Sequence, residues 1–160
     1  MASLWSEKYR PLHLTEIQGH NKLRNMLESA AKNKCRGLPP IILYGPPGTG
    51  KTSIAHALAL DTYPKISPIL SSLYLNASDE RSIEVVRERI FDFVRTRWPG
   101  IERKFVIFDE VETMTDQAQL SLRALLDADE DVVPKPLYIF LCNTLCRVHQ
   151  SIRSRAVAFF

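Results

Sequence analysis

The sequence lacks the features of a membrane-spanning or disulfide-bonded protein. Its 160 residues contain no apolar run that approaches the length needed to cross a bilayer. The first eight residues mix Ser, Trp, Glu and Lys and do not resemble a secretory signal. Only three cysteines are present, Cys35, Cys142 and Cys146, and an odd count without a C-x-x-C pair argues against a disulfide framework and a zinc site. We therefore expect reduced, partly buried thiols, no membrane partner and a cytosolic or nuclear location.

Neither the net charge nor the histidines indicate a nucleic-acid-binding or metal-binding protein. The net charge of +3 is too small to indicate a nucleic-acid partner, so any contact with DNA must come from the local placement of arginines. His13, His20, His56 and His149 show no metal-ligand spacing, and we interpret them as structural or surface residues. The hydrophobic share of 45% and the charged share of 24% are ordinary for a globular protein. The length is sufficient for one domain with a substantial core.

Strand-like apolar runs alternate with helical patterns along the chain, with no repeat or low-complexity tract. We expect strands at 41–44, 70–75, 104–108, 137–142 and 156–160. We expect helices at 15–33, 51–60, 82–97, 116–127 and 147–154, with Leu120, Ala124 and Leu125 facing inward on the fourth. This alternation predicts an α/β fold, a parallel sheet of five strands with helices on both faces.

A glycine-rich loop directly follows the first expected strand. It fits G-x-x-x-x-G-K-[ST] at every position and consists of Gly45, Pro46, Pro47, Gly48, Thr49, Gly50, Lys51 and Thr52, with Ser53 next. Glycines let backbone N–H groups approach an anion, and the following helix points its positive end at it. Lys51 supplies a charge for the β- and γ-phosphates, and the Thr52 hydroxyl can ligate Mg²⁺. A chance match would lack this strand-to-helix context, so we predict a nucleotide site that binds ATP with Mg²⁺.

Two carboxylates end the third expected strand. Four apolar residues, 105–108, precede Asp109 and Glu110. A parallel strand delivers such residues to the carboxyl edge of the sheet, where the phosphate loop also lies. Asp109 can hold Mg²⁺ through water, and Glu110 can polarise an attacking water, which would make the reaction hydrolysis. Alone, this pattern is more typical of a solvated strand end; beside the phosphate loop it favours an ATPase.

Further segments make the chain resemble the AAA+ ATPases, and more narrowly the small subunits of the sliding-clamp loader, replication factor C. The segments that carry the resemblance are 5–11 (WSEKYRP), 75–81 (LNASDER), 118–123 (AQLSLR), 141–143 (LCN) and 154–156 (SRA). Each is weak alone, but together they occur in the family's order. The departures are Glu112 in place of the last Asp of D-E-A-D, Ala156 in place of a cysteine, and Ser82 where the family often has Gly.

The resemblance implies an AAA+ RecA-like P-loop fold and roles for further residues. Tyr9, Arg10 and Pro11 belong to the opening that wraps the adenine. Asn143 would be sensor 1, which senses the γ-phosphate; the alternative is an amide that caps a turn. Arg155 would be an arginine finger that acts on the ATP of a neighbouring subunit. The alternative for Arg155 is a surface arginine paired with an acid.

The family also implies contacts with DNA and with the clamp. Arg81 and Arg87 correspond to positions that contact duplex phosphates, although a solvated helix face with local Glu partners would look the same. On this helix Ile83, Val86, Ile90 and Phe93 form the expected core stripe. We expect Phe91 and Trp98 to be exposed and available for contact with the clamp. Asn76 stands where a polar residue can hold the catalytic glutamate away until DNA binds.

The resemblance thus implies an ATPase subunit that helps load a ring-shaped sliding clamp onto primer–template DNA, together with other loader subunits. We expect residues 1–160 to form the nucleotide-binding domain, with the adenine-wrapping segment and a helix in 1–40 and the P-loop core in 41–160. The lid and collar domains of the family are absent from these residues. Another DNA-associated AAA+ motor or remodeller, or a subunit that binds ATP without hydrolysing it, remain the alternatives. The location would be nuclear in a eukaryote and cytoplasmic otherwise.

Overall fold

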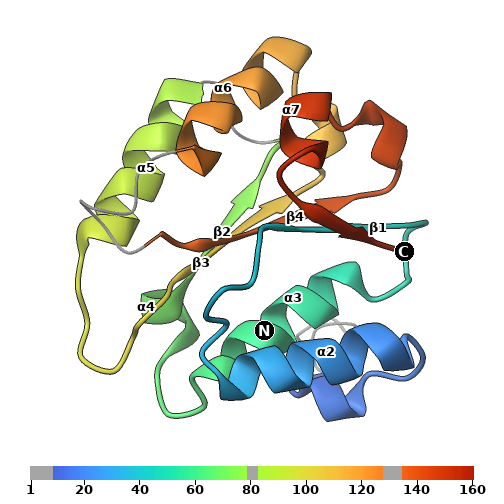
Figure 1. Cartoon of the computed structure of the whole chain (residues 1–160), viewed down its shortest axis with the longest axis vertical. Coiled ribbons are helices and arrows are strands. Elements are labelled where there is room, and N and C mark those ends of the chain that lie inside the picture. The colour runs from blue at the N-terminus through green and yellow to red at the C-terminus, as the bar shows by residue number, and fades with distance from the viewer. Residues whose placement is uncertain (1–8, 79–82, 128–134) are drawn as a thin grey trace, which may run out of the picture.

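The computed structural model describes residues 9–78, 83–127 and 135–160, and within them five strands form one sheet (Figure 1). The strands are β1 (Ile41–Tyr44), β2 (Ser72–Asn76), β3 (Phe105–Asp109), β4 (Leu137–Cys142) and β5 (Val157–Phe159). Their order is β2-β3-β4-β1-β5, and every neighbouring pair is parallel. The predicted α/β fold with a five-stranded parallel sheet is therefore confirmed.

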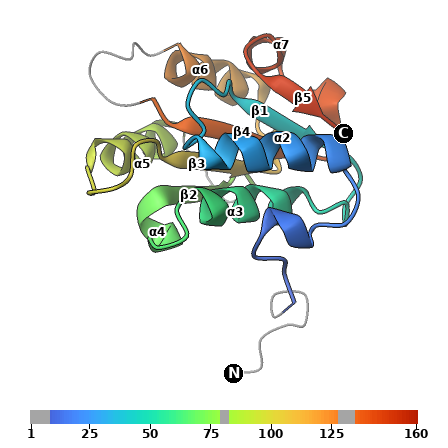
Figure 2. The same cartoon turned by 60° about the horizontal axis from the view of Figure 1, so that its bottom comes forward.

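Helices cover both faces of the sheet (Figures 1 and 2). On one face lie the short η1 (Leu14–Glu16), α2 (Asn21–Lys32) and α3 (Lys51–Thr62). On the other lie α5 (Ile83–Arg95), α6 (Asp116–Leu126) and α7 (Gln150–Arg153). The single turns α4 (Pro68–Ser71), η2 (Val111–Thr113) and η3 (Leu145–Arg147) are connections at strand ends. Among the described residues no helix is both long and apolar enough to span a membrane.

Strand β3, between β2 and β4, separates two hydrophobic cores. Phe105 and Ile107 pack with α2 and α3, whereas Val106 and Phe108 pack with α5 and α6. All four are at most 2% exposed, which explains why a strand covered on both faces has a continuous apolar sequence. Because side chains alternate along a strand, Asp109 continues the row of Phe105 and Ile107 and lies on the α3 side of the sheet.

Helix α6 is rotated relative to the sequence prediction. Leu120 is 46% exposed and Ala124 is also exposed, so the prediction that they face inward was wrong; Leu125 is buried as expected. The buried face instead includes Gln119, whose side chain donates to Met114 O at 3.2 Å and Arg147 O at 3.1 Å and accepts from His149 N at 2.7 Å. These bonds satisfy the buried amide of Gln119. Hydrophobic spacing alone predicts a glutamine on the solvent-exposed face of a helix.

Two expected helices are shorter than predicted. The helix expected at 15–33 is divided, because Gly19 and His20 have positive φ angles of 81° and 49° and end the first turn before α2 begins. The helix expected at 147–154 consists of the separate turns η3 and α7. The other expected elements agree with the observed ones within two residues at each end. In the strand expected at 70–75, α4 occupies residues 68–71 and β2 begins at Ser72.

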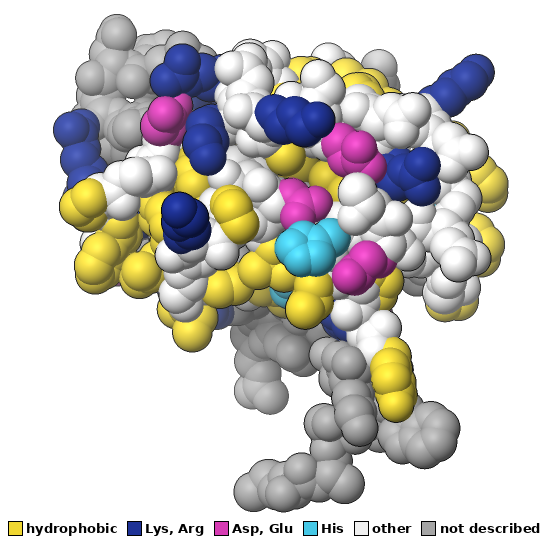
Figure 3. Space-filling view, turned by 90° about the horizontal axis from the view of Figure 1, so that it is seen from below, with side chains coloured by type: hydrophobic (Ala, Val, Ile, Leu, Met, Phe, Trp, Pro, Cys, Tyr) yellow, Lys and Arg dark blue, Asp and Glu magenta, His cyan; other side chains and the backbone are white. Residues whose placement is uncertain are grey.

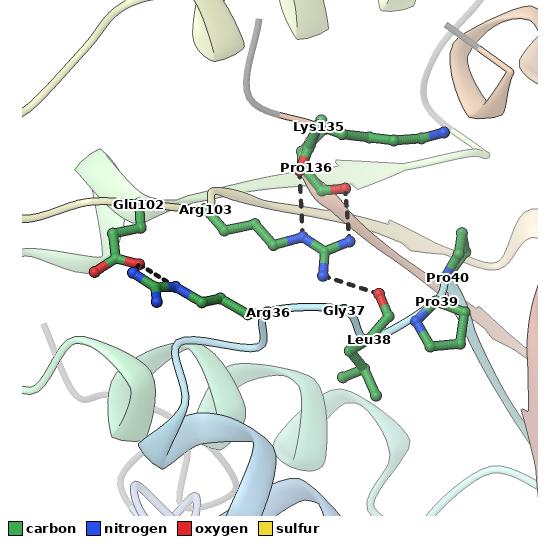
Figure 4. Close-up of a pocket in the computed structure, with 9 residues that line it drawn as sticks. All are labelled: Arg36, Gly37, Leu38, Pro39, Pro40, Glu102, Arg103, Lys135 and Pro136. Carbon is green, nitrogen blue, oxygen red and sulfur yellow. Dashed lines mark hydrogen bonds and ion pairs between the residues drawn. The ribbon is translucent and has the colours of Figure 1, made fainter. Parts of the chain in front are cut away.

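A hollow of about 540 Å³ lies at the amino edge of the sheet, where the chain enters β1, β3 and β4 (Figure 4). Arg103 crosses it and donates to four backbone carbonyls: Cys35 O at 2.5 Å, Leu38 O at 2.8 Å, Lys135 O at 3.2 Å and Pro136 O at 3.5 Å. Beside it Arg36 pairs with Glu102 at 2.6 Å. One guanidinium thus joins segments that are distant in the sequence.

Candidate functional site

The phosphate-loop sequence forms the connection between β1 and α3. After Tyr44 the chain turns through residues 45–50 and enters α3 at Lys51. Gly48 and Gly50 have φ angles of 82° and 88°, a region that a side chain at either position would strain. Gly50 is the residue that caps α3, so the positive end of a twelve-residue helix begins directly after the loop.

This loop lines a second hollow, of about 350 Å³, at the carboxyl edge of the sheet. The lining residues are Pro47, Gly48, Gly50, Lys51, Thr52, Ser53, Asp109, Glu110, Cys142 and Asn143. Lys51 Nζ donates to Gly45 O at 2.7 Å, Pro46 O at 3.0 Å and Asn143 Oδ1 at 3.2 Å. The ammonium is therefore held at the rim of the loop, between the candidate phosphate site and the candidate sensor.

The candidate metal ligands meet at the base of the hollow. Thr52 Oγ1 lies 3.4 Å from Asp109 Oδ2, and the backbone N–H of Glu110 donates to Asp109 Oδ1 at 2.9 Å. A hydroxyl and a carboxylate side by side fit Mg²⁺, which takes few protein oxygens and keeps its remaining positions for water and phosphate. The described residues contain no group of three or more His, Cys, Asp and Glu that would form an all-protein metal cage.

Glu110 follows β3 in a left-handed conformation, with φ of 53° and an exposed side chain. The backbone is held there because Thr113 donates to Glu110 O through both its N–H, at 2.9 Å, and its hydroxyl, at 2.8 Å. A non-glycine residue in this conformation is uncommon and is found at functional sites when the surroundings fix it. Glu110 is also among the residues that line the hollow.

Glu112 holds the end of β4 and was not predicted as a site residue. Its Oε1 accepts from Asn143 N at 2.7 Å, while Oε2 is buried without a hydrogen-bond partner. Burial, and then the charge of Glu112, raise the pKa of the neighbouring Cys142 to about 12, so this thiol stays protonated. Glu112, which replaces the last Asp of the family pattern, therefore fixes the backbone of Asn143, the candidate sensor.

Tyr74 is the second residue that sequence reasoning missed. Its hydroxyl donates to Asp109 Oδ2, the oxygen that Thr52 also approaches. Burial, followed by this hydrogen bond, raises the pKa of Tyr74, while the charge of Arg10 acts in the opposite direction. The available signal was strand alternation, which places Tyr74 and Asn76 on the same face of β2.

Several predicted residues lie outside the hollow. Tyr9, Arg10 and Pro11 begin the described chain, none of them lines the hollow, and Tyr9 is 70% exposed. Asn76 Oδ1 accepts from Ser78 N at 3.0 Å and Ser78 Oγ at 2.8 Å, which closes a local turn.

Arg155 also lies apart from the hollow of its own chain. It donates to Asp127 through Nε at 2.5 Å and Nη2 at 3.0 Å, and to Ser151 O at 3.0 Å. Arg123 donates to the same carboxylate at 3.1 Å, and the Arg155 bond is the main cause that lowers the pKa of Asp127. In this structure, then, Arg155 is an arginine paired with an acid.

One of the two candidate DNA residues lies within the described part of the chain. Arg87 lies on α5 and is half-buried, whereas Arg81 lies outside the described residues. On α5 Val86 and Ile90 are buried, and Phe91 is 38% exposed; Trp98, which follows the helix, is 43% exposed, and both exposures agree with the prediction. The opposite face of the molecule, over α2 and α3, carries Lys and Arg interspersed with Asp and Glu (Figure 3).

The sheet order, the phosphate loop and the acidic strand end together define a P-loop nucleotide-binding protein of the AAA type. The family model described as "ATPase family associated with various cellular activities (AAA)" matches residues 41–160. The chain belongs to this family. Solved structures agree in fold: the RuvB Holliday junction branch migration motor of Thermotoga maritima superimposes with a TM-score of 0.68 at 22% identity, covering 94% of this chain and 48% of that one.

Within the family, the chain is similar to small subunits of replication factor C, as the sequence motifs predicted. It is 40% identical to the replication factor C small subunit of Aeropyrum pernix, over 98% of this chain and 46% of that protein. It is 38% identical to replication factor C subunit 4 of Caenorhabditis elegans, over 97% of this chain and 47% of that protein. The chain spans just under half the length of these relatives.

Proposed function

We propose that this chain is the ATP-binding and ATP-hydrolysing part of a clamp-loader subunit. The observation that carries the proposal is the convergence of Lys51, Thr52, Asp109 and Asn143 on one hollow, although they come from three separate segments. Membership of the AAA family supports ATPase chemistry, and similarity to replication factor C small subunits supports the clamp-loader assignment.

In this proposal the loop binds the phosphates of ATP through its backbone N–H groups and through Lys51, which exchanges its bonds to Gly45 O and Pro46 O for phosphate oxygens. Thr52, and Asp109 through water, would hold Mg²⁺, which would supply positive charge beside the β- and γ-phosphates. Ser53 extends the row of N–H donors at the start of α3. Tyr9, Arg10 and Pro11 close over the base when nucleotide binds.

Glu110 is the proposed catalytic carboxylate. It accepts a hydrogen bond, and then the proton, from the water that attacks the γ-phosphorus; the bond from that phosphorus to the β–γ bridging oxygen breaks, and ADP and phosphate leave. Asn143, fixed by Glu112, orients this water or the γ-phosphate. Glu110→Gln should leave the ATP dissociation constant unchanged and lower turnover in the assembled complex about a thousandfold, which single-turnover assays would measure. Turnover within threefold of the parent chain would remove Glu110 from this role.

Arg155 is proposed to act on the ATP of a neighbouring subunit, because it lies outside its own hollow and on an exposed ion pair that can open. Arg81 and Arg87 are proposed to contact phosphates of primer–template DNA, a binding mode that is independent of base sequence and sensitive to salt. In the assembled complex, changing both to Ala should flatten the dependence of DNA affinity on salt concentration, and an unchanged slope would exclude them.

The whole-protein activity that we propose is ATP-dependent loading of a ring-shaped sliding clamp onto primed DNA, with residues 1–160 as the nucleotide-binding domain. The test is co-purification with the Glu110→Gln chain as bait in the presence of ATP. Recovery of a ring clamp and related ATPase subunits, identified by mass spectrometry and lost on adding Lys51→Ala, is expected. Recovery of identical chains alone would assign the chain to a different AAA machine.

A further inference from the structure

Tyr74 joins the candidate metal site from a strand that carries none of the predicted nucleotide or metal ligands. Its hydroxyl donates to Asp109 Oδ2, and its ring stacks on His56 with centroids 5.1 Å apart and an interplanar angle of 18°. Tyr74 is 36% exposed and does not line the hollow itself; it reaches the site through its bond to Asp109.

The position of Tyr74 follows from the pairing of two strands. In the parallel register of β2 and β3, Asn76 is opposite Asp109 and Tyr74 is opposite Ile107. Tyr74 therefore lies one step below Asp109 on the α3 side of the sheet, and a long aromatic side chain can reach up to the carboxylate.

Helix α3 supports this arrangement at two points. Thr52 and His56 are four residues apart and so lie on the same side of α3. Thr52 approaches Asp109 Oδ2, and His56 stacks on the ring that donates to the same oxygen. One face of the helix thus holds both the carboxylate and its phenol donor.

The result is a carboxylate held on both oxygens. Oδ1 accepts from Glu110 N at 2.9 Å, and Oδ2 accepts from Tyr74 and lies 3.4 Å from the Thr52 hydroxyl. Donors from three different segments fix the plane of the group. Carboxylates that serve metal sites depend on such hydrogen-bonded partners for their orientation.

We propose that Tyr74 is a positioning residue for Mg²⁺: its hydroxyl sets the orientation in which Asp109 accepts from metal-bound water while Thr52 ligates the ion. This inference rests on the proposed nucleotide site and adds a specific residue to it. Tyr74 acts through Asp109 and touches neither nucleotide nor metal.

The variant Tyr74→Phe tests the proposal because it retains the ring and its stacking on His56 and removes only the hydroxyl. Mn²⁺ serves as the probe for Mg²⁺, and its binding to the chain–ATP complex is followed by electron paramagnetic resonance. ATP affinity is measured separately in EDTA. Tyr44→Phe is the matched control, since it removes a hydroxyl that has no hydrogen-bond partner among the described residues and lies directly before the loop.

We expect Tyr74→Phe to weaken Mn²⁺ binding to the ATP complex about tenfold, with ATP affinity in EDTA and thermal stability unchanged. Tyr44→Phe should leave all three values unchanged. Unaltered Mn²⁺ affinity in Tyr74→Phe would overturn the proposal, and tighter binding would also overturn it, because the hydroxyl would then compete with the ion. If the parent chain fails to bind ATP in either condition, the nucleotide site itself is refuted; if it binds and only the Tyr74 effect is missing, the nucleotide site stands.

Discussion

Each of the two edges of the sheet carries a hollow lined by a bonded cationic side chain, Arg103 at one edge and Lys51 at the other, yet the two differ in their hydrogen-bond partners. At the amino edge, Arg103 donates to four backbone carbonyls in the hollow of about 540 Å³. At the carboxyl edge, in the hollow of about 350 Å³, Lys51 bonds two loop carbonyls and the Asn143 side chain.

The difference shows that size does not identify the functional hollow. Carbonyls at strand entries are fixed by the sheet, so the guanidinium that joins them serves the fold. A flexible lysine chain on a glycine-rich loop can exchange its partners for those of a ligand, and a helix N-terminus and two acids stand beside it. The smaller hollow is therefore the candidate site, and the larger one is a structural joint.

The largest expected effect is on nucleotide binding at the carboxyl edge. Lys51→Ala removes the charge aimed at the phosphates and should weaken ATP binding about a hundredfold. The melting temperature should stay the same or rise, since the lysine makes no buried contact that the fold requires. Titration calorimetry measures the first quantity and differential scanning calorimetry the second; a large loss of stability would make Lys51 a structural cation like Arg103.

The opposite pattern is expected at the amino edge. Arg103→Ala leaves four carbonyls without their common donor and should lower the free energy of unfolding by about 2 kcal/mol, with ATP affinity unchanged. Arg36→Ala is the matched control in the same hollow, because it removes only an exposed ion pair with Glu102 and should cost less than about 1 kcal/mol. If urea unfolding shows that the two variants lose the same free energy of unfolding, Arg103 does not have the structural role assigned to it.

A smaller effect, on ATP turnover, is expected from weakening the ion pair of Arg155. Its guanidinium makes as many hydrogen bonds as that of Arg103, but mainly to the exposed carboxylate of Asp127. Asp127→Asn weakens this pair and should raise ATP turnover in the assembled complex by about two- to fivefold at limiting subunit concentration. Arg155→Ala in the same assay should abolish most turnover while leaving ATP binding intact. If Asp127→Asn lowers turnover instead, the ion pair supports the active arrangement and does not restrain Arg155.

The sequence predicted those parts of the site that are contiguous in the chain. The loop 45–52, the strands at 41–44 and 137–142 and the acids after β3 are each defined within a few residues, by local pattern alone. Tyr74 was missed because its role depends on the register between β2 and β3. The buried face of α6 is rotated from the expected one because Gln119 is buried there, with hydrogen bonds to two other segments. The carbonyl partners of Arg103, and the carboxylate partner of Arg155, lie 28 or more residues away, where periodicity carries no information.

Hydrogen–deuterium exchange, with and without ATP and Mg²⁺, tests the comparison of the two edges most directly. We predict slower exchange in residues 45–53, 109–110 and 143, and unchanged exchange in residues 36–40 and 102–104. Protection at the amino edge without protection of the loop would contradict the assignment, and would make the larger hollow the nucleotide site.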